Sequence, residues 1–418
     1  MKESLNDMLQ GSVSAWLQNI EIVCRDAFSL GTYLAIQPKH VIQLGGTFFT
    51  VGLLKSLIAL LAIFSKASVV HISNKNNKQN VMVWCLLFSV LGNILSAATS
   101  SVLLYFVARL ICVASIPVQA ILKSEITKHS KDTDESSKVL MNLETIGTVG
   151  FMVGRVIGGY SGDYVTGNEY VYMSMIGNIL ISIVLVKSLP EEDTKQTKDS
   201  KKSKDAQKHM NIIEEAWQEM SSLFTDLSML ATSQYKDVFA IKLFVEYVSV
   251  INFNALGTTL NAEYRLPMAT IGYCIVFNMT VPIVASWFVS TVRSRYYAED
   301  SGYLRVRHFT SVLVATYAIS SVTSDLPVFI LAITVNSAAK SFIDSALDDL
   351  LHLKIEADQS KGKRNRTTIA LKCFNNINTI AQLIGPLTSG ILSCMFSIRS
   401  NFLACALFMI LTNRLSET

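Results

Sequence analysis

The sequence predicts an all-α membrane protein with twelve transmembrane helices, and two features of the chain carry this prediction. Half of the 418 residues are hydrophobic and only 16% are charged, whereas soluble domains usually carry about 25% charged residues. The apolar residues also fall in long blocks, such as 81–126, where Arg109 is the only charge before Lys123. Because a helix needs about 20 apolar residues to cross a bilayer, such blocks are long enough to hold membrane spans.

The apolar spans form two groups of six. The first group covers 12–36, 41–65, 81–99, 102–122, 139–161 and 168–187, and the second covers 236–258, 266–289, 306–323, 326–349, 366–391 and 398–414. The first span is weak because it contains Glu21, Arg25 and Asp26. We expect it either to be incomplete or to line water.

A polar break divides the two groups. Residues 188–209 are almost wholly polar and are predicted to be a solvated linker. Residues 211–227 alternate apolar and acidic residues at helical spacing, which predicts an amphipathic helix at the membrane surface. The predicted domains are therefore a six-helix bundle over 1–187, a linker over 188–235 and a second six-helix bundle over 236–418.

The loop charges predict the orientation in the membrane. Lysines and arginines crowd the loops after the even-numbered spans, whereas the loops after the odd-numbered spans hold only Lys39, Arg265 and Arg399. Since cytoplasmic loops carry the excess of basic residues, both termini and the linker are predicted to be cytoplasmic. The sequence leaves open whether the protein lies in the plasma membrane or an internal membrane.

The two halves repeat a glycine-rich span. GTVGFMVGRVIGG in the fifth span aligns with NTIAQLIGPLTSG in the eleventh, so that Gly154 matches Gly385 and Arg155 matches Pro386. The fifth span carries Gly147, Gly150, Gly154 and Gly158 on one face, and the eleventh carries Gly385, Pro386 and Gly390. Faces of small residues let membrane helices approach closely, so we expect helix packing at both places.

These motifs resemble a known family. YFVARLICVASIPVQA resembles the fourth-helix arginine motif of drug:proton antiporters in the major facilitator superfamily, and GTVGFMVGRVIGGYSGD resembles their fifth-helix motif. FAIKLFVEYVSVINFNALG, followed by IGYCIVFN, is similar to the organic cation transporter-like group of the solute carrier 22 member 18 type. The resemblance implies the major facilitator fold, with two six-helix bundles that expose a central site to each side of the membrane in turn.

The sequence departs from this family in two of its motifs. The loop between the second and third spans normally carries a Gly…Asp…Gly-Arg signature, but here it reads VVHISNKNNKQN. Arg155 also stands where the family often has proline. Because the signature is missing from the loop between the second and third spans, the resemblance does not carry over a gating role for that loop.

Ionisable residues inside the spans are candidates for function, because a charge within the bilayer costs several kcal/mol unless it is paired or hydrated. Lys242 and Glu246 lie four residues apart, as do Lys340 and Asp344, so each pair shares a helix face. For every candidate the alternative is a structural ion pair or an interfacial position. The candidates for substrate binding or proton coupling are Arg109, Asp344, Glu144, Arg155, Lys55, Lys242 and Glu246.

The expected function is secondary active transport, and the resemblance suggests proton-coupled antiport of organic cations or amphipathic drug-like molecules. A buried carboxylate such as Asp344 or Glu144 would carry the proton. The partners would be the small-molecule substrate, protons and the lipid membrane, with the protein acting as a monomer. Two alternatives remain: a scaffold or receptor of the same fold that does not transport, and an enzyme embedded in the membrane.

The sequence gives no support for several other functional classes of protein. It contains no GxxxxGK[ST] phosphate loop, no HExxH and no GxSxG. The seven cysteines form no CxxC pair, so neither a zinc site nor a disulfide framework is predicted. The lysine-rich linker is short and mixed with acidic residues, which does not favour nucleic-acid binding. We therefore expect neither a cofactor nor a metal.

Overall fold

The computed structural model is all-helical over the residues that it describes. These are residues 2–75, 77–129, 133–164, 168–189, 221, 235–298, 300, 302–359 and 364–416. The predicted linker and its amphipathic helix at 211–227 therefore lie almost wholly outside the described residues.

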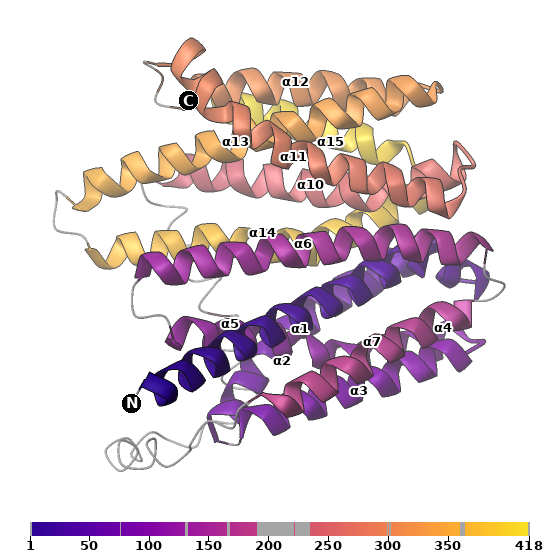
Figure 1. Ribbon diagram of the computed structural model, residues 1–418. Helices are drawn as coiled ribbons and strands as arrows, with labels where there is room; N and C mark the ends of the chain where they lie inside the picture. Colours follow the sequence, from indigo (N-terminus) through magenta and orange to yellow (C-terminus); the bar gives the residue numbers. More distant parts are fainter. Residues whose placement is uncertain are drawn as a thin grey trace. The chain divides into compact units, whose positions relative to one another are not determined.

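The first half of the chain forms the following helices (Figure 1): α1 (Lys2–Gln43), α2 (Phe48–Lys75), α3 (Lys78–Ala98), α4 (Val102–Cys112), the 3-10 helix η1 (Val113–Ser115), α5 (Ile116–His129), α6 (Thr133–Tyr164) and α7 (Asn168–Ser188). The second half forms α10 (Lys236–Ala262), α11 (Met268–Tyr296), α12 (Tyr303–Val322), α13 (Leu326–Gln359), α14 (Arg364–Met395) and α15 (Ser400–Leu415).

These helices confirm the predicted fold class. Each of the twelve predicted spans falls on a helix, with α4, η1 and α5 together forming the fourth. Within the described residues, seven helical segments are long and apolar enough to cross a membrane, and the shorter α15 is also apolar. The weak first span is a continuous part of α1. The second span starts later than predicted, because Gly45 with φ 87° ends the preceding helix in a turn that favours glycine.

The chain packs as two compact units. The first contains residues 1–40 and 60–220, and the second contains residues 41–59 and 221–418. The boundary between the units thus falls inside α2, whose first part packs with the second unit. The division at 187 and 236 remains a prediction from the sequence.

Each unit has its own apolar core. In the first unit α3 packs against α7 and α4, and its core includes Ile22, Leu86 and Leu122. In the second unit α12 packs against α13 and α15, and α10 packs against α14 and α15. Large exposed side chains such as Trp84 and Trp287 lie on the surface of these helices. An apolar exterior of this kind is typical of helices that lie in lipid.

Candidate functional site

Arg109 is a buried cation inside the first unit. It lies on α4 and is only 6% exposed. Its guanidinium carbon lies 3.6 Å from the centroid of the Tyr33 ring, and Nη1 donates a 3.0 Å hydrogen bond to Asn93. Nε has no partner, and no carboxylate of the described part of the chain lies within ion-pair distance. A ring face and an amide therefore stabilise this charge in place of a counter-ion.

Aromatic side chains from three helices form a cluster one turn before Arg109. Tyr105 lies four residues before it, and its hydroxyl accepts a 3.0 Å hydrogen bond from Tyr172 on α7. The ring of His40 on α1 stacks on Tyr105 with a centroid distance of 4.9 Å, and its Nδ1 lies 3.3 Å from the Tyr172 hydroxyl. All three side chains are buried, so α1, α4 and α7 meet in a polar contact.

Asp26 on α1 is a carboxylate whose side-chain partner is an amide. It accepts a short hydrogen bond from the Gln119 amide on α5. The neighbouring Arg25 binds Glu21 at 2.7 Å and Asn178 at 3.2 Å. No lysine, arginine or histidine in the described ranges pairs with Asp26. Among the described residues, the Gln119 amide is thus the group that stabilises the negative charge of this carboxylate.

The second unit contains a cluster of four alternating charges. Lys242 on α10 binds Glu246 on its own helix at 2.8 Å and Asp344 on α13 at 2.9 Å. Lys340 binds Asp344 at 2.7 Å and Glu246 at 3.5 Å. Two positive and two negative side chains therefore balance one another, and both i, i+4 pairs expected from the sequence belong to one cluster. Lys242 also lies 5.1 Å from the ring centroid of Phe374.

Lys55 lies on the part of α2 that packs with the second unit. Its ammonium donates a 2.7 Å hydrogen bond to Asn254 on α10. Both residues line a small cavity of about 20 Å³, together with Thr258, Ser389 and Ser393. This volume suits about one water molecule. The cavity therefore lies at a polar contact between helices and has no room for an organic substrate.

Glycines of α6 lie directly against α1. A Cβ atom at Gly154 would approach the Phe28 carbonyl oxygen to 2.1 Å, and one at Gly150 would approach that of Cys24 to 2.5 Å. Gly158 meets the Thr32 carbonyl in the same way. Gly147, by contrast, has only a side-chain atom of Val23 at an ordinary distance of 3.6 Å. The close approach of the two backbones therefore depends on the last three glycines of the series.

The corresponding residues of α14 pack against α2 and α10. A Cβ atom at Gly390 would come within 2.8 Å of the Phe48 carbonyl oxygen, and one at Gly385 within 2.7 Å of a Val250 methyl group. The Pro386 carbonyl lies where a side chain of Gly52 on α2 would stand. Small residues thus let the first part of α2 reach the backbone of α14.

The two charged candidates of α6 differ in their surroundings. Arg155 is 6% exposed and donates a 2.7 Å hydrogen bond to the Leu34 carbonyl on α1. The side chain of Glu144 is 67% exposed and binds Lys123 on α5 at 2.9 Å. Arg155 therefore contributes to the α1–α6 contact, and Glu144 lies at the surface of the unit.

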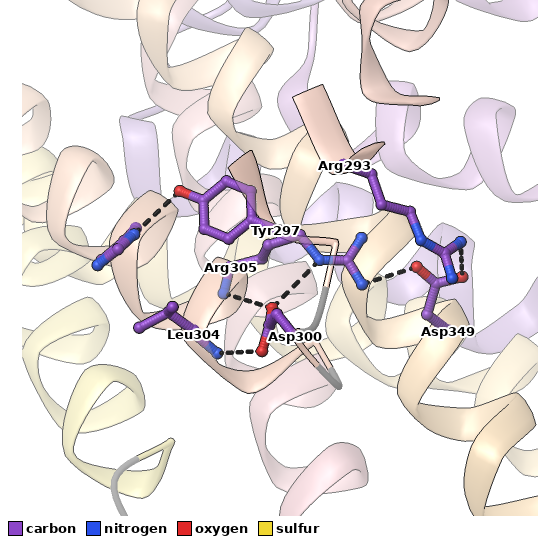
Figure 2. Close-up of polar contacts among 7 residues, drawn as sticks. Arg293, Tyr297, Asp300, Leu304, Arg305 and Asp349 are labelled. Carbon is purple, nitrogen blue, oxygen red and sulfur yellow. Dashed lines mark hydrogen bonds and ion pairs between the residues drawn. The ribbon is translucent and has the colours of Figure 1, made fainter. Parts of the chain in front are cut away.

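A chain of alternating charges links α11, α12 and α13, and sequence reasoning did not identify it (Figure 2). Arg293 binds Asp349 at 2.8 Å, and Arg305 binds the other oxygen of Asp349 at 2.8 Å. Arg305 also binds Asp300 at 3.3 Å. Since the Arg305 side chain is only 3% exposed, these bonds fix the loop between α11 and α12 to α13.

Asp300 caps the start of α12. Its oxygens accept hydrogen bonds from the backbone N–H groups of Leu304 at 3.2 Å and Arg305 at 3.1 Å. Burial raises the pKa of the Asp300 carboxyl, but hydrogen bonds from Gly302, Arg305 and Leu304 N–H groups lower it more, so the pKa lies below the usual 3.8. Gly302 has φ 118° at the N-cap position, a conformation that favours glycine. Beside this cap the Tyr297 hydroxyl lies 2.9 Å from His308 Nδ1.

The sequence of the loop between α11 and α12 contains a signal by which this charge network could have been predicted. Asp300, Gly302 and Arg305 run in the same order as the Asp, Gly and Arg of the signature expected between the second and third spans. Comparing the two halves of the chain for that motif would have found them. Asp26 was noted in the sequence only as a charge that weakens the first span, because the partner that makes it unusual is 93 residues away.

Metal binding finds no support in the described ranges, where no three histidine, cysteine or acidic side chains gather in a way that could hold an ion.

Comparison with known proteins identifies the family to which this fold belongs. A family model described as Major Facilitator Superfamily matches residues 26–360. No curated protein sequence matches the chain. Solved structures with a similar fold include the nucleoside transporter NupG, at 13% identity and a TM-score of 0.69, covering 96% of this chain and 98% of that chain.

Two further solved structures with a similar fold are of transporters named for other substrates. The human organic anion transporter MFSD10 (TETRAN) is 14% identical with a TM-score of 0.58, covering 96% of this chain and 99% of that one. A D-xylose-proton symporter is 12% identical with a TM-score of 0.62, covering 97% and 96%. At these identities the likeness concerns the fold alone. Because the family model matches most of the chain, this protein belongs to the major facilitator superfamily, a family of multi-pass membrane transporters and not of enzymes.

Proposed function

We propose that this chain is a proton-coupled antiporter of organic cations, in which Asp26 binds a proton and the substrate cation in turn. The observation that carries the proposal is the Asp26 carboxylate on α1, which among the described residues has an amide partner and no basic one. A carboxylate inside the membrane is costly to keep charged. A proton or a cationic substrate would relieve that cost, and the two cannot bind the same oxygens together.

The other carboxylates suit this role less well. Asp344 has two ammonium partners, at 2.9 and 2.7 Å, so its charge is already balanced. Glu246 also lies between the same two lysines. Glu144 is exposed and paired with Lys123. We therefore assign the proton-binding role to Asp26 in place of Asp344 or Glu144. The four-charge cluster of the second unit is assigned to the packing of α10 against α13.

Arg109 limits the site to one cation. Tyr33, on which its guanidinium stacks, lies seven residues beyond Asp26 on α1, about 10 Å along the helix axis. The uncompensated charge of Arg109 opposes a second positive charge in this region. A proton must then leave before the substrate cation binds, which is the condition for obligatory exchange.

Alternating access would complete the cycle. The two six-helix bundles, 1–187 and 236–418, would expose Asp26 to each side in turn, joined by the cytoplasmic linker at 188–235 with both termini in the cytoplasm. The D-xylose-proton symporter with a similar fold supports proton coupling as a mechanism available to this architecture. The choice of an organic cation rests on the negative charge of Asp26.

The test is transport by purified protein in proteoliposomes with an imposed pH gradient. Ethidium and tetraphenylphosphonium serve as probe cations. We expect the wild type to move at least one of them against its gradient in exchange for protons, Asp26→Asn to lose this flux, and Asp344→Asn to retain it. Flux that is equal in wild type and Asp26→Asn contradicts the role of Asp26. A folded wild type that moves neither cation contradicts the antiporter and favours a scaffold.

A further inference from the structure

Two opposite faces of α1 serve different purposes. One face packs against the glycines of α6, and it includes Phe28 and Thr32, whose carbonyl groups meet Gly154 and Gly158. The other face carries polar residues at intervals of three and four, which places them in one row on the helix. The polar row consists of Asp26, Ser29, Tyr33, Gln37 and His40.

The polar row is buried and short of hydrogen-bond partners. Ser29, Gln37 and His40 are each at most 5% exposed. Within the described part of the chain, Ser29 Oγ and both polar atoms of the Gln37 side chain have no hydrogen-bond partner, and neither has Nε of Arg109 on the facing helix α4. Buried polar groups in proteins are almost always hydrogen-bonded, and ordered water supplies the bond where the protein does not. The row therefore has the polar atoms to hold several bridging waters.

We propose that this row is a hydrated proton path between the His40 end of α1 and Asp26. His40 lies three residues before the end of α1, on the side that the loop charges predict to be extracellular. Fourteen residues separate it from Asp26, about 21 Å of helix. A hydroxyl, a phenol, an amide and an imidazole follow one another over this length, and each can hydrogen-bond to the next water.

The charges around the row make Asp26, and not the row itself, the place where a proton comes to rest. Arg109 is the charged group that faces the middle of the row, and it disfavours an excess proton there. The tyrosines Tyr105 and Tyr172 contact His40 but carry no charge at neutral pH. At the other end Asp26 is the negative group, while Arg25 and Glu21 neutralise each other. The proton would end as an O–H bond on the Asp26 carboxylate, with no other bond made or broken.

This inference rests on the proposed role of Asp26, and its test needs no substrate. The protein is placed in vesicles in one orientation, and the pH is lowered rapidly on the predicted extracellular side. Infrared spectroscopy follows the carbonyl band of the protonated carboxyl group. Gln37→Leu and Ser29→Ala remove polar atoms from the row, whereas Thr32→Val removes a hydroxyl from the opposite face and serves as the matched control.

We expect the band to rise several-fold more slowly in Gln37→Leu and, to a lesser degree, in Ser29→Ala, with the same final amplitude as in wild type. A purely structural role would change amplitude or stability and leave the rate unchanged. Rates in both variants equal to that of Thr32→Val overturn the proton path while leaving Asp26 as the proton site. A band that persists in Asp26→Asn overturns the proposed function itself.

Discussion

Lys242 and Asp344 form a 2.9 Å ion pair between α10 and α13, and each has a second partner four residues away on its own helix. The four side chains are 11–29% exposed, so the pairs are partly shielded from solvent. Removing one member leaves an unbalanced charge, which costs more than removing a pair together.

We expect Asp344→Asn to destabilise the protein by about 2 kcal/mol, because it leaves Lys242 and Lys340 with Glu246 as their one shared carboxylate. The double variant Lys242→Met with Asp344→Leu should cost less than the sum of the two single changes. Thermal unfolding in detergent measures both. Additive losses would mean that the cluster contributes little to the packing of α10 against α13.

Gly154 is the tightest contact between α6 and α1. Adding a methyl group in Gly154→Ala forces it against the Phe28 carbonyl, and we expect a loss of about 1–3 kcal/mol from overpacking. Gly177→Ala is the matched control, because a Cβ atom there meets nothing within 4 Å. Unfolding temperatures of the two variants compare them directly. A Gly154→Ala protein as stable as Gly177→Ala would show that the helices separate at little cost.

Asp300 gives a pH-dependent prediction. Its pKa in the fold lies below the ordinary 3.8, so its charged form stabilises the native state fully above that value and loses this effect as the pH falls through the lower pKa. Asp300→Asn should therefore lower the unfolding temperature at neutral and mildly acidic pH. Its difference from wild type should shrink only below 3.8. The exposed Glu356→Gln is the control, and a difference that already shrinks at neutral pH contradicts the cap.

The hydrogen bond from Lys55 to Asn254 joins α2 to α10. A double-mutant cycle with Lys55→Met and Asn254→Leu should give a coupling energy of about 1 kcal/mol or more, since one partner is charged. Unfolding in denaturant gives the free energy of unfolding of the wild type, the two single variants and the double variant. A coupling near zero would mean that each side chain is stabilised by other groups, and that α2 is held to the second unit by Gly52 and its neighbours alone.

The sequence was sufficient for the helices and for contacts along one helix. The length of the hydrophobic blocks predicted that each span is helical, and the spacing of four predicted the pairs of Lys242 with Glu246 and of Lys340 with Asp344. It could not show that these pairs join each other, because that depends on how α10 lies against α13. For the same reason Asp26 and Gln119 were not connected, and the start of the second span was placed too early because the turn at Gly45 interrupts no apolar run.

Proton release on substrate binding tests the central claim most directly. In weakly buffered detergent solution, the account predicts that ethidium binding releases protons from the wild type and from Asp344→Asn, and releases none from Asp26→Asn. A pH-indicator dye measures the release while ethidium fluorescence measures the binding. Ethidium binding without proton release in the wild type, or with undiminished release in Asp26→Asn, would contradict the exchange of proton and cation at Asp26.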